Sequence, residues 1–301
     1  MQRGTRKVVW HMTAPVSSEI SPDVVQDGLA IYCIGSGAPM LLMPGPHRFQ
    51  IPGDGSARPL IEGLQALGRQ VISFDPPASG HSARPAHLSM AEMHDCTNEA
   101  LSVLGLSAPI DAFGHSMGGL TLLAYAIEHP ARVRRLVLVG TGSGGRAYMK
   151  TMGSIANYRH PQFIPMVLRA ALHTLLQRRA TEALLNNFIS RCSFYNKHLA
   201  DLDPISLRDW LRPSQGHTDW HRIARRLDYA ARLPEIAAPT LVLCGRHDPQ
   251  FPPAASQELA DGIQSAHLIW FEKSGHFPFI EESEAFWRTV ADFLDLPHQS
   301  R

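Results

Sequence analysis

The chain has 301 residues, of which 44% are hydrophobic and 18% are charged, and its formal net charge is +1. This composition predicts a large packed core and excludes a disordered chain. The near-neutral charge excludes broad electrostatic attraction to nucleic acid or to an anionic membrane.

Short strands and helices alternate along the first half of the chain. Residues 22–34 hold two β-prone runs around Asp27-Gly28, a pair typical of a hairpin turn. Apolar periodicity then predicts, in chain order, a strand at 40–43, a helix at 57–67, a strand at 71–74, a helix at 89–104, a strand at 109–113, a helix after 116 and a strand at 136–139.

The alternation pauses and then returns near residue 240. The later predicted elements are a strand at 241–244, a helix at 254–262, a strand at 267–271 and a helix at 280–294. Such alternation predicts an α/β fold, with a mostly parallel twisted sheet and helices on both faces. We expect residues 22–141 and 236–296 to form this core domain. We expect residues 142–235, which show helical runs and no convincing strand, to form a helical cap over the sheet; a separate helical domain is the alternative.

The motif that carries the clearest chemistry is Gly114-His115-Ser116-Met117-Gly118-Gly119, which fits G-x-S-x-G. It follows a predicted strand and opens a helix, which is the context that this motif requires. The flanking glycines permit a strained turn that exposes the Ser116 hydroxyl, and the Met117 N–H at the helix start points at a developing oxyanion. We expect Ser116 to be a nucleophile; an inert serine in a glycine-rich helix start is the alternative.

A serine nucleophile needs a base to take its proton and a carboxylate to orient that base. Asp248 follows the strand predicted at 241–244, and His276 follows the strand predicted at 267–271. This chain order, serine then acid then histidine, is the one that accompanies a G-x-S-x-G turn, so we expect His276 to be the base and Asp248 the acid. The competing candidates are the base His247 and the acids Glu272 and Glu281.

These landmarks, together with Asp75-Pro76-Pro77-Ala78-Ser79-Gly80-His81-Ser82, make the chain resemble the α/β-hydrolase superfamily. The resemblance implies a Ser116–His276–Asp248 triad and an acyl-enzyme that water hydrolyses. Within the superfamily the chain is similar to the cap-bearing group of proline iminopeptidases, small-ester hydrolases, lactonases and carbon–carbon bond hydrolases. A fold assignment of this kind does not give the substrate.

The chain departs from the family pattern at the oxyanion hole. The family reads H-G-x after the first buried strand, with x donating a second N–H, whereas this chain reads Pro44-Gly45-Pro46-His47. Proline has no N–H, and losing one oxyanion donor costs about 2.7–4 kcal/mol of transition-state stabilisation. We expect the His47 N–H to replace it beside Met117; a side-chain donor is the alternative.

The leading hypothesis is a serine hydrolase that cleaves a small to medium ester, lactone or amide, without cofactor or metal. The alternatives are an aminopeptidase of the proline iminopeptidase type and a non-hydrolytic ligand-binding or lyase member of the same fold. His217-x-Asp219-x-His221 has metal-ligand spacing but no convincing third ligand.

We expect a small molecule as the partner of this chain, and neither nucleic acid nor a membrane; a homo-oligomer is left open. The start of the chain lacks an apolar run typical of a secretory signal. Its four cysteines are isolated, without a C-x-x-C pair, which indicates free thiols in a reducing compartment. Both features predict a cytoplasmic protein.

Overall fold

The computed structural model describes residues 20–45, 51–53, 55, 57–87, 89–144, 193–195 and 226–295. In this part of the chain, one eight-stranded sheet has the order β1-β2-β4-β3-β5-β6-β7-β8. Its strands are β1 Val24–Gln26, β2 Leu29–Ile34, β3 Ala38–Met43, β4 Arg69–Phe74, β5 Ile110–His115, β6 Val133–Val139, β7 Thr240–Gly245 and β8 Ala266–Phe271. Among the strands that the structure describes, only the pairs β1–β2 and β2–β4 are antiparallel, so the predicted mostly parallel sheet is confirmed.

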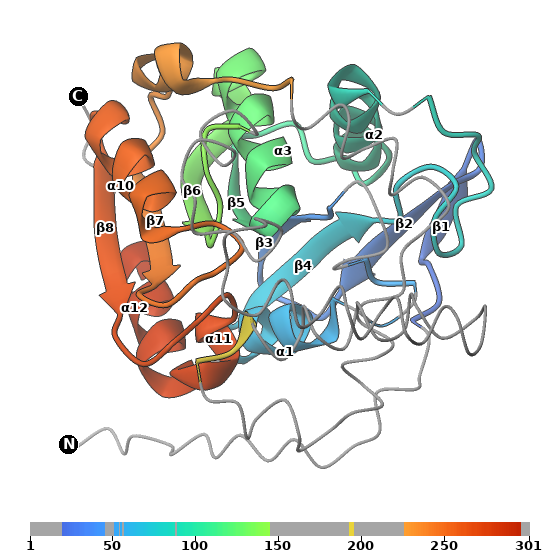
Figure 1. Cartoon of the computed structure of the whole chain (residues 1–301). Helices are drawn as coiled ribbons and strands as arrows, with labels where there is room; N and C mark the ends of the chain where they lie inside the picture. Colours follow the sequence, from blue (N-terminus) through green and yellow to red (C-terminus); the bar gives the residue numbers. More distant parts are fainter. Residues whose placement is uncertain are drawn as a thin grey trace, which may run out of the picture.

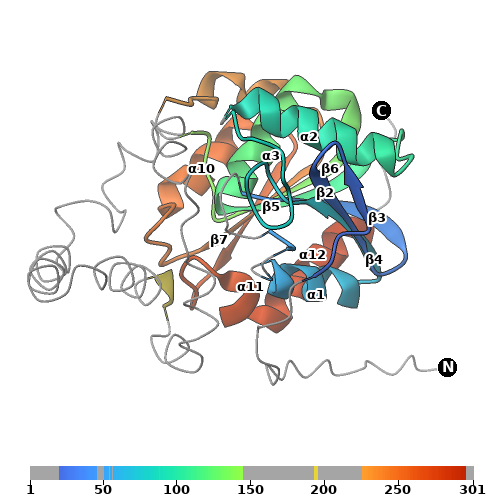
Figure 2. The same cartoon turned by 90° about the vertical axis from the view of Figure 1, so that its right-hand side faces the viewer.

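Helices lie on both faces of the sheet. They are α1 Arg58–Ala66, α2 Met90–Val103, α3 Ser116–Glu128, α10 Pro253–Gly262, α11 Pro278–Glu281 and α12 Ser283–Asp295, with 3-10 helices η1 Pro130–Arg132 and η2 Ala230–Glu235. Figures 1 and 2 show α2, α3 and α10 on one face, and α1, α11 and α12 on the other. The α/β class inferred from the alternation is therefore confirmed.

The central strands are buried on both faces, which explains their continuous apolar runs. Along β3, Leu41 and Met43 join the core beneath α2 and α3, while Met40 and Leu42 join the core beneath α1 and α12. Alternate side chains of a strand point to opposite faces, so each strand contributes to two cores. The carboxyl ends of the strands lie between these two cores and consequently give a rigid support to the loops that follow them.

The hairpin at the start of the sheet forms as predicted. Asp27 and Gly28 both have positive φ, 45° and 78°, as the favoured two-residue hairpin turn requires. They join β1 to β2, which pair antiparallel from Val24↔Ile31 onward.

The helix predicted at 280–294 is instead two helices, α11 and α12. Glu282 leaves helical geometry, with φ −122° and ψ 46°. Its carboxylate turns back to accept hydrogen bonds from Lys273 N at 2.9 Å and Ser274 Oγ at 2.7 Å. These bonds to the preceding loop account for the break, which apolar periodicity does not reveal.

Of the predicted cap, residues 142–144, 193–195 and 226–235 lie in the described part of the chain. The rest of the segment 142–235 lies outside it, so the cap stays a prediction. Among the residues that the structure describes, no helix has the length and apolar character needed to cross a membrane.

Candidate active site

The parallel strands β5, β7 and β8 bring three loops to one edge of the sheet. β5, β6, β7 and β8 pair in parallel, so their carboxyl ends share that edge, which is where open α/β sheets bind ligands. Ser116 follows β5 directly, Asp248 follows β7, and His276 follows β8. Side chains separated by up to 160 positions therefore meet.

Ser116 is the first residue of α3 and stands at the sharp, strained turn where β5 ends. Its φ is +55°, a left-handed conformation that costs a non-glycine residue about 1–3 kcal/mol. A Cβ on Gly114 would lie 2.8 Å from Gly118 O, and a Cβ on Gly118 would lie 2.4 Å from Met43 O. Both glycines are therefore required by close backbone approach, which is why the motif has them on either side of the serine.

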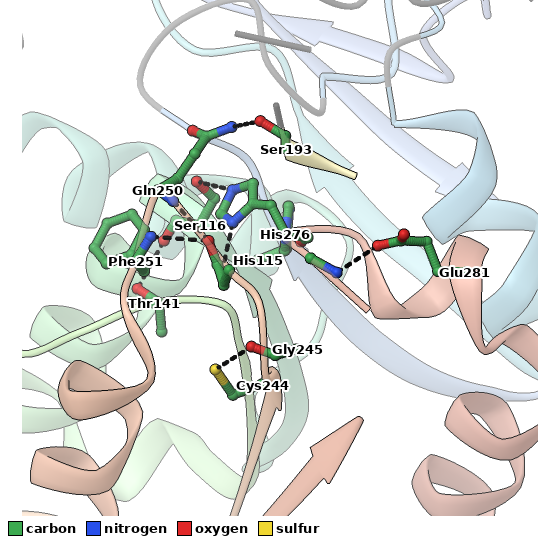
Figure 3. A network of polar contacts seen from close by, with 12 residues as sticks. His115, Ser116, Thr141, Ser193, Cys244, Gly245, Gln250, Phe251, His276 and Glu281 are labelled. Carbon is green, nitrogen blue, oxygen red and sulfur yellow. Dashed lines mark hydrogen bonds and ion pairs between the residues drawn. The ribbon is translucent and has the colours of Figure 1, made fainter. Parts of the chain in front are cut away.

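Ser116, His276 and Asp248 form a continuous hydrogen-bonded chain. Ser116 Oγ lies 3.0 Å from His276 Nε2, and His276 Nδ1 lies 2.8 Å from Asp248 Oδ2, as Figure 3 shows for the serine and the histidine. The carboxylate accepts a hydrogen bond from Nδ1–H, so the neutral ring presents Nε2 as an acceptor to the serine hydroxyl. This arrangement can take the hydroxyl proton as the oxygen attacks a carbonyl carbon.

The side chain of Asp248 is buried, and both of its carboxylate oxygens accept hydrogen bonds. Oδ1 accepts hydrogen bonds from Gln250 N at 2.8 Å and Phe251 N at 3.0 Å, which leaves Oδ2 for His276. These two bonds fix the direction in which Asp248 orients the imidazole.

His115 is a second buried histidine at the site. Burial, and then the proximity of His276, lower its pKa well below the usual range, so the His115 ring is neutral at pH 7. The His115 Nε2 donates to the backbone carbonyl of His276 over 2.8 Å, and the two rings lie 4.5 Å apart. His115 therefore holds the main chain of His276 from the β5 side.

The competing candidates for the base and the acid make other contacts. The His247 ring stacks on Tyr195, 4.4 Å between centroids. Glu272 is exposed and pairs with Arg246. Glu281 accepts backbone hydrogen bonds, from Gly275 N at 2.6 Å and from Tyr195 N at 2.7 Å.

Half of the expected oxyanion hole lies in the described part of the chain. Met117 is the second residue of α3, so its N–H belongs to the first turn, where N–H groups have no acceptor within the helix. The expected second donor, His47, lies outside the described residues, as do Pro46 and the His217-x-Asp219-x-His221 pattern. Among the residues that the structure describes, no group of three metal-ligating side chains gathers.

Sequence reasoning missed several residues that hold the three side chains in place. Thr141 Oγ1 donates to Ser116 O at 2.7 Å, and Ser193 O accepts from His276 N at 2.7 Å. Gln250 Nε2 donates to Ser193 Oγ, also at 2.7 Å. Most of these contacts involve backbone atoms, for which a single sequence carries no signal.

Comparison with known proteins gives the family. The model of the α/β-hydrolase fold family matches residues 50–283. A 2-hydroxymuconate semialdehyde hydrolase of Pseudomonas putida is 33% identical over 94% of this chain and 97% of its own length. A 2-hydroxy-6-oxononadienedioate/2-hydroxy-6-oxononatrienedioate hydrolase of Cupriavidus pinatubonensis is 30% identical over 90% and 93%, respectively.

Solved structures share the fold. An α/β-fold hydrolase of Bacillus anthracis superposes with a TM-score of 0.72 at 23% identity, over 88% of this chain and 95% of that one. An enol-lactonase of Burkholderia xenovorans gives 0.68 at 23% identity, over 91% and 99%. The family match over most of the chain, the full-length relatives and the shared architecture all agree: this chain belongs to the α/β-hydrolase fold family, whose members named here are hydrolases.

Proposed function

We propose that this chain is a serine hydrolase in which Ser116 attacks a substrate carbonyl, His276 carries the proton and Asp248 orients His276. The observation that carries the proposal is the chain of hydrogen bonds from Ser116 Oγ to Asp248 Oδ2, which begins at the strained first residue of α3. A serine in such a turn, with a base within hydrogen-bond distance, is an activated nucleophile.

The proposed reaction has two halves. In the first, the Ser116 oxygen bonds to the carbonyl carbon while its proton moves to His276 Nε2, and the Met117 N–H stabilises the oxyanion. The leaving group departs with the bonding electron pair and takes the proton from His276. In the second, His276 activates water, which releases the acyl group from Ser116. We propose the His47 N–H as the second oxyanion donor.

For the substrate we propose an oxo acid in which hydrolysis breaks a carbon–carbon bond, with small esters or lactones as the second class. The names of the full-length relatives describe hydrolysis of 2-hydroxy-6-oxo dienedioates and of a muconate semialdehyde. Such compounds contain an oxo group and no ester. Hydrolysis at the oxo carbon therefore breaks a carbon–carbon bond. A proton first moves from the 2-hydroxyl to the carbon beside the oxo group, which converts the enol into a ketone, so that the leaving fragment delocalises the electron pair of the broken bond into its conjugated ketone before it is protonated.

A substrate panel separates the candidate functions. We expect Ser116→Ala to lower kcat by at least about 10³-fold on the best of three substrates: a 2-hydroxy-6-oxo dienoate, an acyl ester and an aminoacyl arylamide. The exposed Ser102→Ala is the matched control and keeps full activity.

Each outcome of the panel has a distinct meaning. Preference for the arylamide would favour the aminopeptidase instead. A fluorophosphonate that leaves Ser116 unlabelled, with no turnover of any substrate, would show a non-hydrolytic member of the fold and overturn the proposal.

A further inference from the structure

Residues 193–195 lie against the two loops that carry His276 and Asp248. The carbonyl of Ser193 accepts the backbone N–H of His276 at 2.7 Å. The hydroxyl of Ser193 accepts from Gln250 Nε2, and the backbone N–H of Gln250 binds Asp248 Oδ1 at 2.8 Å. One residue far from the core motifs in sequence thus contacts both loops, and Figure 3 shows its bond to Gln250.

The carboxylate of Glu281 joins this segment to the loop of His276. Its Oε1 accepts from Tyr195 N at 2.7 Å, and its Oε2 accepts from Gly275 N at 2.6 Å. Glu281 ends the short helix α11, and Figure 3 shows its side chain directed toward the loop of His276. The two backbone donors bind different oxygens of Glu281, so both links depend on a carboxylate.

The approach of the two segments is close enough to require a glycine. A Cβ added to Gly275 would lie 2.1 Å from Ser193 O, so any side chain there would push the segment away. Aromatic rings flank the contact on both sides: Phe194 lies on Phe277, with 4.9 Å between centroids, and Tyr195 lies on His247. The glycine of Ser274-Gly275-His276 is therefore explained by residues 193–195.

We propose that Glu281 is a positioning residue for the general base, acting by tying residues 193–195 to the loop of His276. The inference rests on the proposed role of His276. The main chain of His276 is held from two sides, its N–H by Ser193 O and its carbonyl by His115 Nε2. The hydrogen bond from Tyr195 N to Glu281 fixes the position of the Ser193 carbonyl two residues earlier. Glu281 therefore controls one of the two hydrogen bonds that position the main chain of His276.

The test compares Glu281→Gln with Glu282→Gln. Glutamine at 281 offers one carbonyl oxygen and one NH2 group, so one of the two backbone donors meets another donor and that link breaks. Both hydrogen bonds to Glu282 end on a single oxygen, Oε2. Glutamine can therefore keep both of them, which makes Glu282→Gln a control of matched size, charge and location.

Two measurements are made on each purified full-length variant: the steady-state constants on the best substrate and the downfield proton NMR signal of the His276 imidazole N–H that faces Asp248. We expect Glu281→Gln to lower kcat about 10- to 100-fold, because small misplacement of a catalytic group costs that much. We also expect it to shift or broaden the imidazole signal. Glu282→Gln is expected to leave both unchanged.

The proposal is overturned if Glu281→Gln keeps kcat within about twofold of the wild type and the imidazole signal unmoved, or if both variants change both readouts equally. Should Glu281→Gln fail to fold, Glu281→Asp, whose shorter side chain cannot bring its carboxylate to both Tyr195 N and Gly275 N, is measured for the same two readouts and must move both. The NMR signal does not depend on turnover. An inactive wild type with an unlabelled Ser116 therefore rejects the proposed function, while the signal still reports whether Glu281 positions His276.

Discussion

His115 illustrates how one buried side chain sets the geometry of another. Because burial and His276 lower the pKa of His115 well below the usual range, its ring stays neutral at pH 7. Its Nε2–H has a defined acceptor, the carbonyl of His276 at 2.8 Å. A protonated ring there would place a positive charge beside the proposed base, whose own protonation the reaction requires.

We expect His115→Leu to lower the free energy of unfolding by about 1–3 kcal/mol, because it leaves the buried carbonyl of His276 without this donor. It should also lower kcat, because the main chain of His276 loses one of the two hydrogen bonds that position it. His115→Gln places an amide nitrogen near the original Nε2 position and should restore most of both quantities. Urea unfolding gives the free energy and steady-state kinetics give kcat for both variants. Equal losses in His115→Leu and His115→Gln would show that the hydrogen bond is unimportant.

The residues proposed for catalysis were readable from the sequence because each has a local signal. Ser116 stands in a strand–turn–helix motif, and Asp248 and His276 each follow a predicted strand. Glu281 has no such signal, since one of its partners is the backbone N–H of Tyr195, 86 positions away. The sequence suggested it only as a competing acid, and the structure gives it backbone partners instead.

At the scale of elements, the contact between α3 and the end of β3 shapes the turn at Ser116. Gly118 allows this contact, because a Cβ there would lie 2.4 Å from the backbone oxygen of Met43. A backbone atom in a central strand cannot move aside as a flexible side chain can. The contact also brings Pro44 and Gly45, which follow β3, beside Gly118 in the first turn of α3.

We expect Gly118→Ala to destabilise the fold by about 1–3 kcal/mol, the usual cost of overpacking, and to slow labelling of Ser116 by a fluorophosphonate at least about tenfold. Gly105→Ala is the control, because an added Cβ there meets nothing within 4 Å and only its φ of +68° is unfavourable. That variant should lose about 1–2 kcal/mol and label at the wild-type rate. Wild-type labelling of Gly118→Ala would contradict the argument.

Element order was predictable from the sequence, but one element boundary was not. Buried parallel strands and amphipathic helices impose strong periodicities, so the alternation in 22–141 and from 240 onward matches the sheet. The break between α11 and α12 depends on Glu282 binding Lys273 N and Ser274 Oγ. These tertiary bonds override a helical pattern that continues through the break.

At the scale of the whole molecule, the sheet divides the interior into two apolar cores, and the proposed site lies at the carboxyl edge between them. The first core, beneath α2 and α3, also contains a polar group that charges at low pH. His94 of α2 is buried, and no described residue hydrogen-bonds its Nε2. Its ring instead contacts Tyr125 edge-on, with 5.6 Å between centroids.

Burial, and then the charge of His129, lower the pKa of His94 from 6.5 to about 4. The unfolded chain therefore binds a proton at His94 below about pH 6.5, whereas the folded chain does so only near pH 4. Folding stability attributable to the neutral ring is thus complete above pH 6.5 and is lost as the pH falls from there toward 4. The loss reaches up to about 3 kcal/mol at the acidic end of this window.

His94→Phe keeps an aromatic ring against Tyr125 and removes the titrating group, so its stability should change less between about pH 7.5 and about pH 5 than that of the wild type. His267→Gln, on the exposed side of β8, is the control and should follow the wild type. Urea unfolding at the two pH values measures the difference. Equal losses in the wild type and His94→Phe would mean that other groups set the acid limit. A smaller loss in His94→Phe alone would locate that limit beneath α2, in the core on the opposite face of the sheet from α11, the helix that carries Glu281.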